Sequence, residues 1–380
     1  MVFLLILLGL ASHVVFGYLV RKHHDREYLE KEKEDWLTPI MEVCFEITKL
    51  PKRFVDILRN EGTANPFKLE EDRFPGLSGF TGSPNAKEMY LLNTRYDATL
   101  DDCIVELVDL RNFETLHTWN PDIDAMENLV DLGRKTSFRH PILESDRSLV
   151  VATSYANTAR EEGIEDLSLV RVDPQGKLIQ SWKRNFHHSL ERDADGNYWG
   201  CVRHDEKVSG YKYSYRHDGI KKVSPQGETL FYKSIVELFV ENQMGYLIFS
   251  LDSHPSKDPI HINEVQPVDF DGEYWKKGDV FLSFRDQSMV LLYRPSTNKI
   301  IWEGTGHFSK QHDVDILDQS RISIFNNNAS FRVPGENPFK MRSHATVQGN
   351  NQVVIYDFAT DQYSLYLDEA LQREDVKTSY

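Results

Sequence analysis

Short apolar stretches that alternate with polar residues recur along the chain from about residue 87 onwards. Each stretch is followed by a turn and by a second strand-like stretch, and four of the five turns contain the Gly, Asn or Asp that hairpins favour. The second stretches end in aromatic residues that are 63, 50, 70 and 64 residues apart, namely Trp119, Trp182, Tyr232, Trp302 and Tyr366. This spacing indicates a repeated antiparallel hairpin.

A second series of strands lies between these hairpins, and each strand is preceded by a histidine. The four histidines, spaced by 48, 73 and 51 residues, are His140, His188, His261 and His312. Units of four strands and about 50 to 70 residues, with no convincing helix between them, predict an all-β fold of the β-propeller type. We expect about six blades within residues 61–380, with the last blade incomplete. An elongated solenoid is the alternative, although its repeats are usually shorter.

The position of the histidines within the repeat has a structural consequence. The first strand of every propeller blade lines the central channel, so residues that begin those strands converge although they are far apart in the sequence. The alternative is that each imidazole only hydrogen-bonds a neighbouring blade. His187 and His188 are adjacent, and alternation along a strand allows only one of them to face the channel. We predict that His188 does.

The N-terminal segment has a different character. Residues 2–20 carry no charge, and a helix of this length spans about 29 Å, which is roughly one hydrocarbon core. We predict a single-pass membrane anchor over residues 1–21, with a cleaved signal peptide as the alternative. Residues 22–60 are charge-dense and predict a helical stalk and linker. Arg21 and Lys22 would keep the main body in the cytoplasm by the positive-inside rule.

Composition excludes several classes of function. With 44 basic and 59 acidic residues, the net charge of −15 repels nucleic acid. The three cysteines, Cys44, Cys103 and Cys201, are far apart, which argues against a disulfide framework and a zinc knuckle. The acidic turn that begins at Asp193 lacks the glutamate that would complete a calcium loop, because His204 stands in its place. We therefore predict neither a resident metal nor another cofactor.

Three segments, residues 258–268, 278–317 and 322–332, resemble the arylsulfotransferase family of PAPS-independent propeller enzymes. The order and spacing of several short motifs carry the resemblance: His261 with Asn263, Ser283 with Arg285, Trp302, Gln311 with His312, and Phe325 with Asn326 to Arg332. A weaker similarity extends back to about residue 85. The resemblance therefore covers roughly three quarters of the chain.

The resemblance implies that a sulfuryl group moves from an aryl sulfate to a phenol through a sulfohistidine, in a propeller outside the cytoplasm. Its catalytic residues would be His261, His312 and Arg332, which hold the sulfate oxygens and protonate the departing phenolate. The predicted substrate-binding residues are His188, Asn263, Arg285 and Gln311. Imidazolium N–H groups and a planar guanidinium suit the negative charge on a sulfuryl group in transfer.

One departure from the family pattern leaves alternatives open. The nucleophilic histidine of well-studied members is expected in a later blade, beyond Tyr380, and His344 is the only histidine after Arg332 that could replace it. The chain would then be a fragment, use another nucleophile, or have lost catalysis. Two other functions remain: a catalytically inactive propeller that binds a sulfated or phenolic ligand or a protein, and a metal- or quinone-dependent oxidoreductase whose histidines hold a metal.

Overall fold

The computed structural model describes most of the chain after residue 78, with gaps. The described ranges are 79–80, 82–97, 99–100, 102–121, 136–155, 168–183, 186–203, 217–249, 258–332 and 345–378, together with short helical pieces between residues 12 and 48. The chain divides into two compact units, Met1–Asp72 with Glu206–Tyr215, and Arg73–Asp205 with Arg216–Tyr380. All the described strands belong to the second unit.

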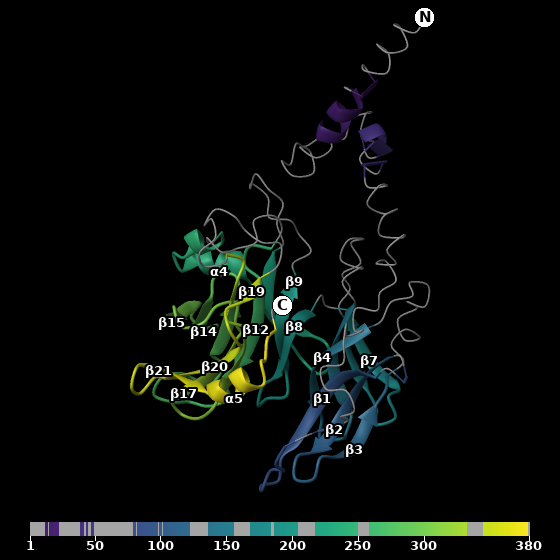
Figure 1. Cartoon of the computed structure of the whole chain (residues 1–380). Coiled ribbons are helices and arrows are strands. Elements are labelled where there is room, and N and C mark those ends of the chain that lie inside the picture. The colour runs from purple at the N-terminus through teal and green to yellow at the C-terminus, as the bar shows by residue number, and fades with distance from the viewer. Residues whose placement is uncertain are drawn as a thin grey trace, which may run out of the picture. The chain divides into compact units, whose positions relative to one another are not determined.

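Five antiparallel sheets follow one another in the second unit (Figure 1). The first contains β1 (Tyr90–Asp97), β2 (Asp102–Asp109) and β3 (Glu114–Trp119), and the second contains β4 (Thr136–Leu143), β5 (Leu149–Tyr155), β6 (Ser168–Val172) and β7 (Leu178–Lys183). The third contains β8 (Phe186–Arg192), β9 (Tyr198–Arg203), β10 (Asp218–Val223) and β11 (Thr229–Ser234).

The fourth and fifth sheets have the same form. The fourth contains β12 (Ile262–Pro267), β13 (Val280–Phe284), β14 (Met289–Arg294) and β15 (Lys299–Thr305), and the fifth contains β16 (His312–Ile316), β17 (Arg321–Asn326), β20 (Gln352–Asp357) and β21 (Gln362–Tyr366). A short pair, β18 (Ala329–Ser330) and β19 (Thr346–Val347), interrupts the last sheet in sequence. The remaining described elements of this unit are α4 (Ile235–Glu241), η3 (Gly245–Leu247) and α5 (Asp368–Arg373).

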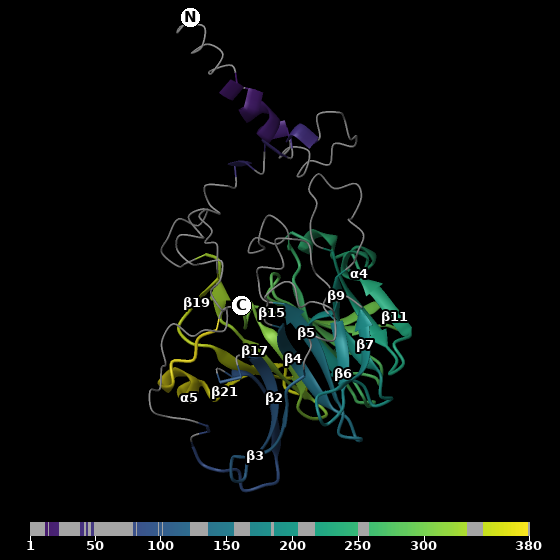
Figure 2. The same ribbon diagram turned by 90° about the vertical axis from the view of Figure 1, so that its right-hand side faces the viewer.

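The sheets are the blades of a β-propeller. Strands within each sheet pair with their neighbours in sequence order, apart from the interruption by β18 and β19. The first strands of successive sheets contact one another, β4 with β8, β8 with β12 and β12 with β16, and β1 also contacts β4. Figure 2 shows the strands of the second sheet, β4, β5, β6 and β7, in this order. The predicted all-β propeller is therefore confirmed.

The predicted hairpins are confirmed, whereas the number of blades is corrected. Each of the five aromatic residues that define the repeat lies in the last strand of its sheet, from β3 to β21. The described residues form five blades instead of about six, and the last blade is complete with four strands. Its outer hairpin, β20–β21, is the predicted hairpin that ends at Tyr366. The first blade has three described strands.

Apolar packing between the sheets fixes their positions. One cluster joins the fourth and fifth blades and contains Trp275, Phe281, Ile324 and Tyr356, with Trp302 packed against it. Trp302 stacks on Tyr356 with ring centroids 4.9 Å apart. Aromatic pairs of this kind add about 1 kcal/mol to the contribution from buried area. Rigid contact between the blades holds the first strands, and so the channel residues, in place.

A bulge occurs at the same place in the first strand of four blades. The pairing register of β4, β8, β12 and β16 with the second strand shifts there. Non-glycine residues at or beside these shifts have left-handed backbones, with φ of 46° at His140, 57° at His188, 51° at His261 and 49° at Asp313. A bulge re-aims side chains that strict alternation would send to opposite faces. The bulges therefore decide which side chains meet.

Only small parts of the first unit are described. Residues 12–13, 15–22, 39–41, 43–44 and 47–48 are helical. Within the described residues, no helix combines the length and apolar character needed to cross a membrane. Most of the predicted anchor and stalk, and His344, lie outside the described residues.

Candidate functional site

Three of the four predicted channel histidines meet. His188 Nε2 lies 3.2 Å from His261 Nε2, and the centroids of these two rings are 4.7 Å apart. The ring of His312 lies 6.2 Å from that of His188, centroid to centroid. All three side chains are half-buried and therefore remain accessible to a small molecule. His140 belongs to a different group of side chains, described below.

His187 and His188 do not separate as the alternation of a flat strand requires. Their Nδ1 atoms lie 2.7 Å apart, because the left-handed backbone at His188 turns its ring toward that of its neighbour. His187 is buried, and its Nε2 atom lies 3.6 Å from Asp218 Oδ1. His188 extends to His261. His188 is thus the member of the pair that reaches the cluster, and His187 packs behind it.

The hydrogen bonds define the tautomers of this row of rings. His261 Nδ1 lies 2.7 Å from Asp258 Oδ2, an acceptor, so a neutral His261 has its lone pair on Nε2. His188 Nε2 then donates to His261, and His188 Nδ1 accepts from His187. The chain ends at His187 Nε2, which faces a carboxylate of Asp218 without a hydrogen bond. A proton can move along such a row if each ring changes tautomer in turn.

His312 is held differently from the other histidines. Its Nδ1 atom lies 3.3 Å from Oδ1 of Asn327, a buried side chain. An amide oxygen only accepts hydrogen bonds, so Nδ1 of His312 carries the proton and Nε2 carries the lone pair. The ring therefore presents a nucleophilic nitrogen.

Burial keeps the rings of His188 and His312 neutral. Desolvation, followed by the charge of His261, lowers the pKa of His188 well below its usual value. Desolvation also lowers the pKa of His312 to about 3, and His261 and Arg285 add to the effect. The imidazolium form expected for His312 from the sequence is thus disfavoured in this structure. Other groups must supply the positive charge for an anion.

Two buried cations, Lys310 and Arg285, are candidates for that charge, and the charge of Arg285 lowers the pKa of His312. Lys310 has no exposed surface and Arg285 is 8 % exposed. Both face one carboxylate, because Asp286 Oδ1 lies 3.1 Å from Lys310 Nζ and 3.6 Å from Arg285 Nη1. Both also lie over the ring of Phe331, at 4.6 Å and 5.7 Å from its centroid. A lysine and an arginine that lie close together are groups that attract an anionic ligand electrostatically.

Two predicted substrate-binding residues pack between blades. Gln311 has no exposed surface, and its Nε2 atom donates to Ser283 Oγ and to two backbone carbonyls of the fourth blade. Asn263 is also buried and donates to the carbonyl of Gln311. These contacts place both residues behind the channel wall. Their positions fix the start of β16, and hence His312.

Arg332, the third predicted catalytic residue, lies next to the aromatic platform of the two cations. It directly follows Phe331, and its backbone N–H donates to Ser330 Oγ. Its role in holding sulfate stays a prediction. Lys310 and Asp286 were not predicted, although Lys310 stands two residues before His312 in the sequence.

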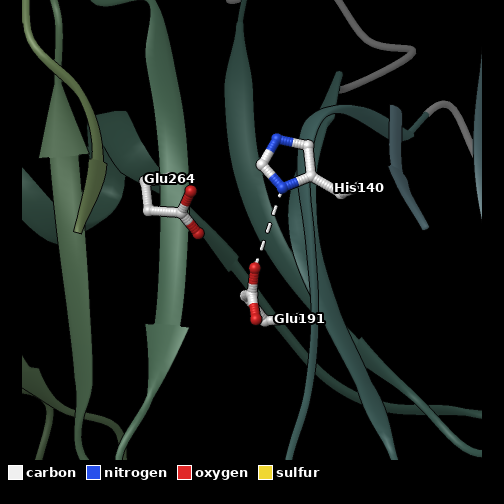
Figure 3. Close-up of side chains that lie close together, drawn as sticks. All are labelled: His140, Glu191 and Glu264. Atoms are coloured by element: carbon white, nitrogen blue, oxygen red, sulfur yellow. Dashed lines mark ion pairs between the residues drawn. The ribbon is translucent and has the colours of Figure 1, made fainter. Parts of the chain in front are cut away.

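A second group of side chains lies further along the same first strands. His140, Glu191 and Glu264, from β4, β8 and β12, each offer one atom within 4.8 Å of the other two (Figure 3). A nitrogen and two carboxylate oxygens at such distances could hold a metal ion. The sequence interpretation missed Glu191 and Glu264, because a carboxylate in an alternating strand normally faces solvent.

Acidification is expected to destabilise the fold. An unfolded histidine takes up a proton near its usual pKa of about 6.5, whereas folded His312 stays neutral until about pH 3. The unfolded state therefore binds more protons in this range, and the free energy of unfolding falls as pH falls. From about pH 7.5 to 5.5 we expect a loss of about 1 kcal/mol from His312, measured by urea denaturation. In His312→Asn the free energy of unfolding should depend less steeply on pH. An unchanged slope would contradict a low pKa of His312 in the folded protein.

The fold and the site together define a β-propeller whose channel holds a row of histidines beside two buried cations. Residues 154–380 match the family model described as Arylsulfotransferase (ASST). This match covers more than half of the chain, so the protein belongs to the arylsulfotransferase family. The resemblance seen in the sequence is confirmed. No curated protein matches the chain.

Several solved structures are distantly similar. A protein of unknown function from Bacteroides caccae shares 9% identity, with 70% of this chain and 78% of that chain covered and a TM-score of 0.36. The Cps50 (Swd1) β-propeller domain of Myceliophteria thermophila shares 8% identity, with coverages of 76% and 85% and a TM-score of 0.35. Because these identities and TM-scores are low, the number of blades is taken from the strand order of the sheets and not from these structures.

Proposed function

We propose that the protein transfers a sulfuryl group from an aryl sulfate to a phenol, with His312 as the temporary acceptor. The observation that carries this proposal is the hydrogen bond from His312 Nδ1 to Asn327, which favours the tautomer with the lone pair on Nε2. The charge of Arg285 also acts on this ring. A neutral imidazole is a nucleophile, whereas an imidazolium is not. The low pKa of His312 supports this role.

The reaction would proceed in two displacements. In the first, His312 Nε2 attacks the sulfur atom, the bond between sulfur and the phenolic oxygen breaks, and the phenolate leaves. In the second, the oxygen of an acceptor phenol attacks the sulfur, the S–N bond breaks, and the acceptor loses its proton. The sulfuryl group carries negative charge throughout, so Arg285 and Lys310 stabilise both transition states electrostatically. Arg332 is proposed as a further ligand of the sulfate oxygens.

The row of His261, His188 and His187 is proposed to handle the proton. The departing phenolate takes up a proton and the acceptor phenol releases one, so the two half-reactions balance. His261 is oriented by Asp258 and exchanges a hydrogen bond with His188, which supports its role at the leaving oxygen. Nε2 of His261, once it leaves its contact with His188, would donate a proton in one half-reaction and accept one in the other.

Purified full-length protein should release 4-nitrophenol from 4-nitrophenyl sulfate when phenol is present and PAPS is absent. Phenyl sulfate should appear in equal amount, because the group is transferred and not hydrolysed. The measurement is the absorbance of 4-nitrophenolate together with product analysis by mass spectrometry. Binding of the ester without turnover would instead support the inactive, ligand-binding propeller. Absence of both binding and turnover would remove the proposal.

A further inference from the structure

His140, Glu191 and Glu264 join three consecutive blades across the channel. His140 Nδ1 lies 3.7 Å from Glu191 Oε1 (Figure 3). Two ligands of a tetrahedral zinc ion lie roughly 3.4 Å apart, given bonds of about 2.1 Å. The third atom, from Glu264, lies within 4.8 Å of the other two. Small side-chain movements would complete the geometry.

Apart from these distances, the surroundings of the Glu264 carboxylate also indicate a bound ion. Its side chain has no exposed surface, and Oε1 accepts a hydrogen bond from the N–H of Val265. Oε2 is buried and has no hydrogen-bond partner among the described residues. Figure 3 shows the carboxylate turned toward Glu191. A buried carboxylate oxygen without a partner is costly, and it needs either a proton or a cation.

Negative charge gathers around this point and is not balanced within the group. Desolvation raises the pKa of Glu264 well above its usual value, and Glu191, Asp313 and Asp315 raise it further. His140 is the basic member of the group, and the two other ligands remain partly open, with exposed fractions of 32% for the His140 side chain and 28% for that of Glu191. An ion could therefore enter from the channel.

We propose that His140 Nδ1, Glu191 and Glu264 bind a divalent first-row transition metal ion, with Zn²⁺ as the probe. A set of one imidazole and two carboxylates suits Zn²⁺, whereas Mg²⁺ and Ca²⁺ prefer oxygen ligands alone. Three protein ligands leave one coordination position open. The ion would fasten the second, third and fourth blades to one another at the channel. This proposal is independent of the proposed sulfuryl transfer.

This site is separate from the histidine row. Glu191 and Glu264 each lie three residues beyond His188 and His261 along the same strands, a distance of roughly 10 Å. The histidine row therefore lies at one level of the channel, and His140 with the two carboxylates lies at another. The two levels can be tested separately by substitutions at each.

The test is a titration of EDTA-treated full-length protein with ZnCl₂, in which bound zinc is counted after gel filtration and affinity is measured by chelator competition. Wild type should bind one more equivalent than Glu264→Gln. Because Glu264 is buried, Glu191→Gln serves as a second variant, and its affinity should fall at least about 10- to 100-fold. Zinc should also raise the Tm of wild type but not that of Glu191→Gln.

Two matched controls make the result decisive. Asp315→Asn removes a carboxylate that faces the same channel but is not a proposed ligand, and it should keep the equivalent of zinc. His188→Gln removes a histidine of the other level and should keep it too. The proposal is overturned if Glu264→Gln and Glu191→Gln bind zinc as wild type does. It is equally overturned if only His188→Gln loses the ion, since the histidine row would then be the metal site.

Discussion

Replacing His312 by asparagine is expected to lower the rate of sulfuryl transfer by at least about 10³-fold, because the substitution removes the proposed nucleophilic atom. Asparagine keeps an N–H group near the position of Nδ1, so the hydrogen bond to Asn327 can persist. The structural disturbance should therefore be small. The measurements are the release of 4-nitrophenol and the mass of the peptide that contains residue 312 after incubation with the donor alone.

The covalent intermediate separates this role from a merely structural one. Wild-type peptide should gain the mass of a sulfuryl group in the absence of phenol and lose it when phenol is added. His307→Asn is the matched control, because His307 is exposed and stacks on Tyr363 outside the histidine row. Its rate should equal that of wild type. A labelled peptide elsewhere in the chain, or normal turnover by His312→Asn, would assign the nucleophile to another residue.

Much of the propeller was predictable because its signals are local. The alternation of apolar and polar residues and the turn residues of each hairpin lie within about 20 residues of sequence, and Trp182 and Trp302 mark outer strands as expected. The completeness of the last blade was not predictable in the same way. Residues 327–351 separate β17 from its neighbour β20, and the short pair β18–β19 lies between them, so the sequence pattern alone did not assign the predicted hairpin that ends at Tyr366 to the sheet of β16 and β17.

The candidate site was predictable only in part. The histidines were found because each begins a strand, but their contacts depend on bulges, and bulges break the rule of alternation that the sequence argument used. The left-handed residue at His188 brings its ring against that of His187. Glu264 was missed for the same reason, because the direction of its side chain depends on the register shift between Ile262 and Glu264 in β12.

Buried charges were the other omission. Lys310 precedes the motif residue Gln311, and a lysine in a loop is normally solvated. Its partner Asp286 is 24 residues away in sequence, and no local pattern links the two. Gln311 belongs to the family motif and packs between blades, where its Nε2 atom donates to Ser283 Oγ. Its role in substrate binding stays a prediction.

Asp286→Asn is expected to destabilise the protein and at the same time to strengthen its binding of anions. Asp286 is buried and neutralises part of the charge on Lys310 and Arg285. Removing one partner from a buried ion pair costs about 3 to 5 kcal/mol, because the opposite charge that compensated the buried cations is lost. The free energy of unfolding, measured in urea without sulfate, should fall by this amount. Inorganic sulfate should then restore more stability to the variant than it adds to wild type, since the anion replaces the missing negative charge.

Asp279→Asn is the matched control for this opposite pair of effects. Asp279 is equally buried and pairs with Arg294 through two contacts of 2.7 Å. Its loss should also destabilise the fold, but sulfate should add no more stability to this variant than to wild type. The comparison thereby corrects for the general stabilising effect of sulfate on proteins. If sulfate rescued both variants equally, Arg285 and Lys310 would not form an anion site. A specific rescue of Asp286→Asn would show that burial of the two cations lowers the free energy of unfolding and that a bound anion restores it.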